Sequence, residues 1–123
     1  MKSAILKYNT QAPRYTSYPP APHFQPRTAD EYGAALRHME SSPVSLYVHV
    51  PFCQEMCWYC GCHTSATKKY GPVEDYLGLV LREIDLVSAL LPRRIPLAHI
   101  HFGGGSPSML KPDDFRRVMM AIG

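Results

Sequence analysis

Four cysteines lie close together near the middle of the chain, with the spacing C-x3-C-x2-C-x-C: Cys53, Cys57, Cys60 and Cys62. Closely spaced thiolates on one loop can wrap a compact iron–sulfur cluster, which takes sulfur ligands. Structural zinc sites usually combine two C-x2-C pairs that lie a dozen or more residues apart, and the second pair is absent here. The spacing therefore favours an iron–sulfur cluster over zinc, and over structural or redox-active thiols.

The rest of the sequence suits a metal-binding role for these thiols. A disulfide within so tight a loop would be strained. The first residues lack the apolar core of a signal peptide, and no run approaches transmembrane length. We therefore expect a cytoplasmic protein, in which thiols stay reduced. The net charge of +3 is mild and decides nothing alone. We expect no nucleic-acid or membrane partner, and a monomer.

A second feature is the glycine run of residues 103–105, followed by Ser106. Glycines at the end of a strand let the backbone approach a ligand closely, because no Cβ intervenes. The run lacks the lysine of a phosphate-binding loop and the G-x-G-x-x-G dinucleotide pattern. Taken alone, it indicates only a tight turn.

Several polar side chains lie on the segments that lead into these two features. Tyr47 and His49 are two residues apart, so they share one face of a strand that runs directly into the cysteine loop. They are either satisfied core residues or site residues, and the cysteine loop next to them makes them candidates. His99 and His101 likewise share a face, and we expect them to pack or to support site residues.

The elements that position these residues follow from local patterns. Five prolines between residues 13 and 26 exclude helix and central strand, so residues 1–27 are predicted to form an extended arm. Thr28 and Glu31 form a capping box, which predicts a helix to about Met39. Further along, the predicted elements are a strand at 45–50, a helix from Pro72 to about Leu91 with one apolar face that includes Val73, Tyr76 and Leu77, a strand at 97–102 ended by the glycines, and a helix from Pro112 to about Ile122.

This order of elements predicts an α/β fold with parallel strands and a right-handed crossover. Two such strands cannot form a self-sufficient sheet, and a complete barrel of this kind needs roughly 200 residues or more. We therefore expect the chain to be the N-terminal fragment of a longer protein. Residues 1–44 would form the arm and short helix, and residues 45–123 the start of the core domain.

The C-x3-C-x2-C spacing of Cys53, Cys57 and Cys60 resembles the cysteine loop of the radical S-adenosylmethionine (SAM) superfamily. The resemblance implies that these residues ligate a [4Fe–4S] cluster and that the amine and carboxylate of SAM chelate the fourth iron. The reduced cluster would then cleave SAM to a 5′-deoxyadenosyl radical. Cys62 stays off the cluster by the same resemblance, and we retain it with His49 as a candidate catalytic residue.

Longer stretches at residues 13–19, 46–53, 60–62 and 101–108 resemble the oxygen-independent coproporphyrinogen III oxidases of that superfamily. The resemblance extends from Tyr8 onward and implies the first two βα units of a partial (βα)6 barrel. It also implies decarboxylation of two propionates of coproporphyrinogen III to vinyl groups, giving protoporphyrinogen IX. Departures are small, because Ser106 and Ser108 replace common threonines and Phe102 replaces a common tryptophan.

That family holds two SAM molecules, and the resemblance assigns contacts to each. Tyr47 and Gly104 match contacts to the SAM on the cluster, whereas Tyr59, Gly105 and Ser106 match contacts to the second. Tyr59 is otherwise a packing aromatic. The resemblance also implies a tetrapyrrole substrate with four carboxylates, for which Arg14 is a candidate partner, and an external electron donor and acceptor.

Two other functions remain open from the sequence. One is a related tetrapyrrole-handling radical SAM enzyme or haem-transfer protein, and the other is a non-catalytic metal-binding module. We expect the fragment alone to be inactive.

Overall fold

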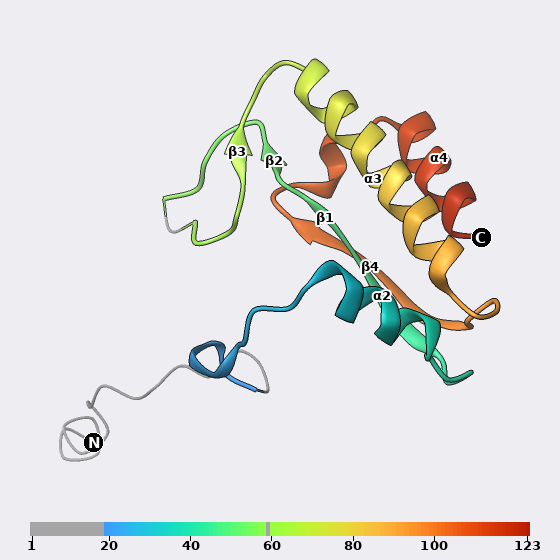
Figure 1. Ribbon diagram of the computed structural model, residues 1–123. Coiled ribbons are helices and arrows are strands. Elements are labelled where there is room, and N and C mark those ends of the chain that lie inside the picture. Colours follow the sequence, from blue (N-terminus) through green and yellow to red (C-terminus); the bar gives the residue numbers. More distant parts are fainter. Residues whose placement is uncertain (1–18, 59) are drawn as a thin grey trace, which may run out of the picture.

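The computed structural model describes residues 19–58 and 60–123 (Figure 1). Most of the predicted arm, including Arg14, and the site candidate Tyr59 lie outside the described residues. The elements in order are η1 (Ala21–His23), α2 (Ala29–Arg37), β1 (Val44–Val50), β2 (Phe52–Cys53), β3 (Ser65–Ala66), α3 (Gly71–Leu90), β4 (Leu97–Gly104), η2 (Pro107–Met109) and α4 (Pro112–Ile122).

The two long strands, β1 and β4, pair in parallel, and α3 connects them. Tyr47 lies opposite His101, and Val50 lies opposite Gly104. This arrangement confirms the predicted α/β fold with parallel strands. The predicted end of the second strand was wrong, because β4 continues through Gly104 instead of stopping at residue 102. Both additional residues stay paired with β1, so the glycines extend the strand.

A second, shorter pair lies where the chain enters the cysteine loop. The strand β2 pairs in parallel with β3, which is the returning limb of that loop. The Ser65 N–H donates to the Pro51 carbonyl at 2.9 Å, and the Thr67 N–H donates to the Cys53 carbonyl at 2.8 Å. On the other side of β2, the Ser106 N–H donates to the Phe52 carbonyl at 2.8 Å. The loop therefore leaves and returns beside the same short strand.

The α-helices begin where the sequence patterns predict, but the short 3-10 helix η1 lies in the arm that is predicted to be extended, so that prediction was wrong at Ala21–His23. The Glu31 N–H donates to Thr28 Oγ1 at 3.2 Å, and the Thr28 N–H donates to Glu31 Oε2 at 2.8 Å, which confirms the capping box. The helix ends at Arg37, slightly before the predicted Met39. A proline occupies the first turn of both α3 and α4, where the missing N–H costs no hydrogen bond.

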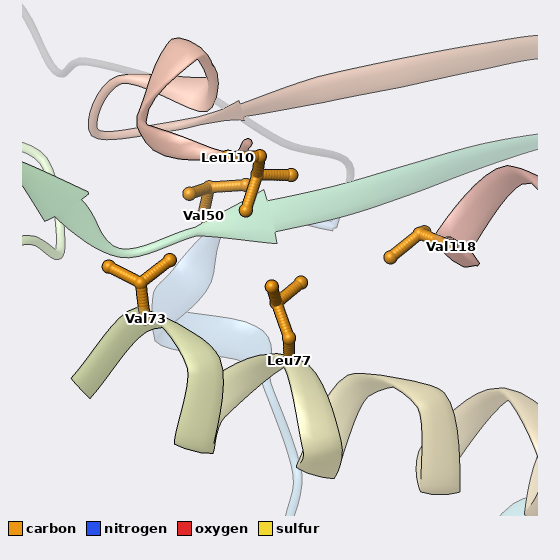
Figure 2. Close-up of a cluster of buried hydrophobic side chains, with 5 residues drawn as sticks. All are labelled: Val50, Val73, Leu77, Leu110 and Val118. Carbon is orange, nitrogen blue, oxygen red and sulfur yellow. The ribbon is translucent and has the colours of Figure 1, made fainter. Parts of the chain in front are cut away.

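The hydrophobic core lies between the β1–β4 sheet and the helices α3 and α4, which cover the same side of it (Figure 1). Figure 2 shows Val73 and Leu77 pointing from α3 toward β1. Both belong to the predicted apolar face of this helix, and both are buried. The core residues are Val50, Val73, Leu77, Leu110 and Val118.

The opposite side of the sheet is open among the described residues. Burial alternates along β1, so Val48 and Val50 are buried while the Tyr47 side chain is 52% exposed. The first residues of β4, including His99 and His101, are exposed as well. In the described part of the chain, no helix combines the length and apolarity needed to cross a membrane.

Candidate functional site

Cys53 ends the short strand β2 and lies between two hydroxyl groups. Ser106 Oγ is 3.4 Å from the Cys53 sulfur, and Thr64 Oγ1 is 3.7 Å from it. Both hydroxyls donate to the sulfur, and these bonds, Ser106 first, lower the pKa of the Cys53 thiol. A lower pKa favours the thiolate, which is the form that binds metals. The glycine turn and the returning limb of the cysteine loop therefore meet at this cysteine.

The other three cysteines lie on the outer part of the loop. All four thiols are free, and Cys57 and Cys62 are exposed. The negative charge of Cys60 is the largest cause that raises the pKa of Cys62, and Cys53 and Cys57 add to it. The four sulfurs thus share one electrostatic neighbourhood.

We tested whether these thiols fit a metal cluster. Among the residues that the structure describes, no group of three His, Cys, Asp or Glu side chains is arranged to hold a metal ion. Four free thiols on one loop are nevertheless the ligand type that iron–sulfur clusters require. The residues fit a cluster by their chemistry and shared loop, while their sulfurs do not converge on a common point.

Each glycine of the run makes room for a group on a neighbouring segment. A Cβ on Gly103 would lie 2.8 Å from the Tyr47 ring, and one on Gly104 would lie 2.7 Å from the His49 ring. A Cβ on Gly105 would lie 2.4 Å from Thr64 Oγ1 and 2.5 Å from the Phe52 carbonyl oxygen. Gly104 also has φ +102°, which side chains disfavour. The run is therefore a packing surface for the site residues as well as a turn.

Tyr47 and His49 are joined by a hydrogen bond on the open face of the sheet. The Tyr47 hydroxyl is 3.0 Å from His49 Nδ1, and His49 Nε2 is 2.9 Å from the His63 carbonyl oxygen. A carbonyl only accepts, so Nε2 donates, and in the neutral ring Nδ1 accepts from the Tyr47 hydroxyl. The His101 ring stacks on Tyr47 with centroids 5.8 Å apart. His49 is therefore held at both nitrogens.

Three groups contribute to this site although the sequence does not mark them as site residues. Tyr76 of α3 donates to the His49 carbonyl at 2.8 Å, and its ring meets Phe52 edge-on. Burial raises the pKa of Tyr76, which keeps the hydroxyl as a donor. Thr64 and the His63 carbonyl come from the loop limb, where no periodic pattern marks them. Only the position of Tyr76 on the apolar face of a predicted helix was available as a signal.

The fold and its cysteine loop place the chain among known proteins. No protein-family model matches the chain. Among solved structures, coproporphyrinogen III oxidase from Escherichia coli, described as a radical SAM enzyme, matches with a TM-score of 0.82 and 31% sequence identity. The match covers 98% of this chain and 26% of that one. The chain therefore shares its fold with part of a radical SAM enzyme.

Curated relatives narrow the class to one family. An oxygen-independent coproporphyrinogen III oxidase from Bradyrhizobium diazoefficiens is 46% identical over 97% of this chain and 27% of its own length. A protein of the same name from Mannheimia haemolytica is 42% identical over 96% of this chain and 81% of its own length. The chain belongs to the oxygen-independent coproporphyrinogen III oxidase family. It spans about a quarter of the length of relatives from Bradyrhizobium diazoefficiens, Cereibacter sphaeroides and Pseudomonas aeruginosa.

Proposed function

We propose that this chain is part of a radical SAM enzyme that converts coproporphyrinogen III to protoporphyrinogen IX by oxidative decarboxylation of two propionates. Family membership supports the reaction. The observation that links the reaction to particular residues is the position of Cys53, which lies between the glycine turn and the returning loop limb.

The architecture that we propose follows the same family. Residues 45–123 form the first two βα units of a partial (βα)6 barrel, and residues 1–44 precede it as an arm and a short helix. The parallel β1–β4 pair with α3 and α4 on one side supports this arrangement. The exposed face of the sheet, with Tyr47 and His101, would then face the barrel interior.

Cys53, Cys57 and Cys60 would hold a [4Fe–4S] cluster, and Cys62 would remain free of it. When bound, the cluster supplies the electron that cleaves SAM and starts the radical reaction. The hydroxyls of Ser106 and Thr64 would then donate to the sulfur of the Cys53 ligand, and the pairing of β2 with β3 would hold Cys53 in place.

The remaining site residues would bind and orient the small molecules. Tyr47 and Gly104 would contact the SAM on the cluster, and Tyr59, Gly105 and Ser106 would contact a second SAM. His49 is the candidate for proton transfer, because its ring is oriented at both nitrogens and lies over Gly104. Cys62 is the second catalytic candidate, since its thiol is exposed and adjacent to the proposed ligands.

The partners follow from the reaction. A tetrapyrrole with four carboxylates is the substrate, and Arg14 is a candidate to bind one of them. An external donor supplies electrons, and an external acceptor takes the electron left after carbon dioxide departs. We propose a monomer that works in the cytoplasm, where its four thiols stay reduced.

Anaerobic reconstitution of the full-length protein with iron and sulfide tests the site. We expect one cluster per chain in the wild type and in Cys62→Ser, and loss of the cluster in Cys53→Ser, Cys57→Ser and Cys60→Ser. Addition of SAM should change the electron paramagnetic resonance spectrum of the reduced cluster. One zinc per chain without iron or sulfide would overturn the proposal, as would loss of the cluster in Cys62→Ser.

Product analysis tests the reaction. We expect the reconstituted wild type to form protoporphyrinogen from coproporphyrinogen under anaerobic conditions, with SAM and a reductant present. A reconstituted protein that cleaves SAM but leaves coproporphyrinogen unchanged would instead be a related tetrapyrrole-handling enzyme. Haem binding and transfer without SAM cleavage would identify a haem-transfer protein.

A further inference from the structure

Thr64 lies on the returning limb of the cysteine loop, and its hydroxyl contacts the sulfur of a cysteine eleven residues earlier. Thr64 Oγ1 is 3.7 Å from Cys53 Sγ, and both residues are half-buried. The hydroxyl occupies the space that Gly105 leaves open, because a Cβ there would lie 2.4 Å from Oγ1. The hydroxyl is therefore confined between a glycine and a sulfur.

The backbone fixes this contact. Two hydrogen bonds directly after Thr64 tie its limb to β2: the Ser65 N–H donates to the Pro51 carbonyl, and the Thr67 N–H donates to the Cys53 carbonyl. These bonds set Thr64 beside Cys53 before any side-chain rotation is considered. The contact thus follows from the pairing of β2 with β3.

We propose that Thr64 is a positioning residue that donates a hydrogen bond to the Cys53 sulfur in the cluster-bound protein and thereby raises the reduction potential of the cluster. This inference rests on the proposed function. Reduction adds one negative charge, part of which resides on the ligand sulfurs, and a hydroxyl donor stabilises that charge. Loss of the donor therefore makes reduction less favourable and lowers the potential.

Variants of Thr64 test the effect on the reduction potential apart from SAM binding, which variants of Ser106 cannot do. Ser106 also donates to the Cys53 sulfur, at 3.4 Å, but it is a proposed contact of the second SAM. A change at Ser106 would alter both functions together. Thr64 has no proposed role toward SAM or the tetrapyrrole, so its variants report on the sulfur contact alone.

The test is a redox titration of the reconstituted full-length protein without SAM, followed by the electron paramagnetic resonance signal of the reduced cluster. We expect Thr64→Val, which keeps the side-chain shape, to shift the midpoint potential to a more negative value with unchanged iron content. Thr64→Ser keeps the hydroxyl and should retain the wild-type potential. Thr67→Val is the matched control, because the Thr67 hydroxyl bonds to Lys69 and not to a sulfur.

A second measurement covers the case in which Thr64→Val assembles poorly. Electron nuclear double resonance in H2O and D2O detects exchangeable protons near the cluster in the wild type. We expect the coupling of one such proton to be absent in Thr64→Ala and present in Thr64→Ser. Identical spectra in Thr64→Ala and the wild type, or equal potentials in Thr64→Val and the wild type, would overturn the inference. A wild type that assembles no cluster would overturn the proposed function together with it.

Discussion

The two faces of β1 differ in what they contact, although they alternate residue by residue along one strand. Val48 and Val50 are buried against the helix layer. Tyr47 and His49 point to the open face, where a hydrogen bond joins them and the glycines of β4 make room for their rings. Apolar packing on one side thus holds the strand in place, so that the other side can present polar groups without relying on them for stability.

The largest change in the free energy of unfolding is expected from a substitution in the core that packs against the buried face of β1. Leu77 is 3% exposed in the core, whereas Leu79 of the same helix is 65% exposed. We expect Leu77→Ala to lower the free energy of unfolding by about 2–5 kcal/mol, because it removes buried apolar surface and leaves a cavity. Leu79→Ala is the matched control and should change it by less than about 0.5 kcal/mol. Urea denaturation of the full-length protein measures both, and equal losses would contradict the burial of this face.

A substitution at Gly105 tests the close contact between the end of β4 and the start of the cysteine loop. A Cβ there would meet the Phe52 carbonyl oxygen at 2.5 Å, and a backbone atom cannot rotate away. We expect Gly105→Ala to cost about 1–3 kcal/mol of unfolding free energy through overpacking, and to reduce iron incorporation because the Cys53 segment must move.

Gly78→Ala on α3 is the control for this change. No atom outside its own helical turn lies within 4 Å of the Gly78 Cβ position, so the substitution should stabilise the protein by up to about 1 kcal/mol. Iron analysis and urea denaturation distinguish the two variants. A fully stable, fully loaded Gly105→Ala protein would show that the close approach seen at this glycine is not required.

A smaller change in the free energy of unfolding is expected when the hydrogen bond between the start of α3 and α4 is removed. The Tyr70 hydroxyl donates to Asp114 Oδ2 at 2.5 Å, and this bond, followed by Arg117, holds the pKa of Asp114 below its ordinary value of 3.8. A carboxylate with a lowered folded pKa stabilises the fold above its unfolded pKa, and loses that contribution as the pH falls through the folded pKa.

Tyr70→Phe should therefore cost about 1 kcal/mol at pH 7, and the difference from wild type should shrink as the pH falls below 3.8. Urea denaturation over a pH series measures this trend. Tyr32→Phe is the control, since Tyr32 is 57% exposed on α2. A difference that stayed constant down to the lowest pH would show that the Tyr70 hydroxyl does not act through Asp114.

The smallest stability effect is expected on the open face. Tyr47→Phe removes the hydroxyl that lies 3.0 Å from His49 Nδ1 but keeps the ring over Gly103. We expect the free energy of unfolding to change by less than about 0.5 kcal/mol. Affinity for SAM should fall by roughly 2- to 10-fold, the effect of one hydrogen bond. A stability loss as large as that of Leu77→Ala would remove the distinction between the two faces.

The sequence predicted the long elements well because each carries a strong local signal. The capping box at Thr28, the proline in the first turn of α3 and the apolar face through Val73 and Leu77 require no tertiary information. The same holds for the cysteine spacing, which is readable without a structure. These features determined the fold class and the location of the candidate site.

The finer parts of the site depend on tertiary contacts that no local pattern encodes. The strand β3 has only two residues, so it shows no alternation, and its partner β2 is equally short. Thr64 acquires its contact with Cys53 only through this pairing. The glycines were expected to end a strand, but their neighbours across the sheet, Tyr47 and His49, give them their role.

The anchoring of the cysteine loop at its base has a consequence for maturation. Both limbs are tied to one strand, while Cys57 and Cys62 near the tip are accessible to solvent. The backbone hydrogen bonds at the base bring the two limbs together, so they offset part of the entropy cost of closing the loop. Under the proposed function, cluster assembly would therefore have to position chiefly Cys57 and Cys60 on the outer part of the loop.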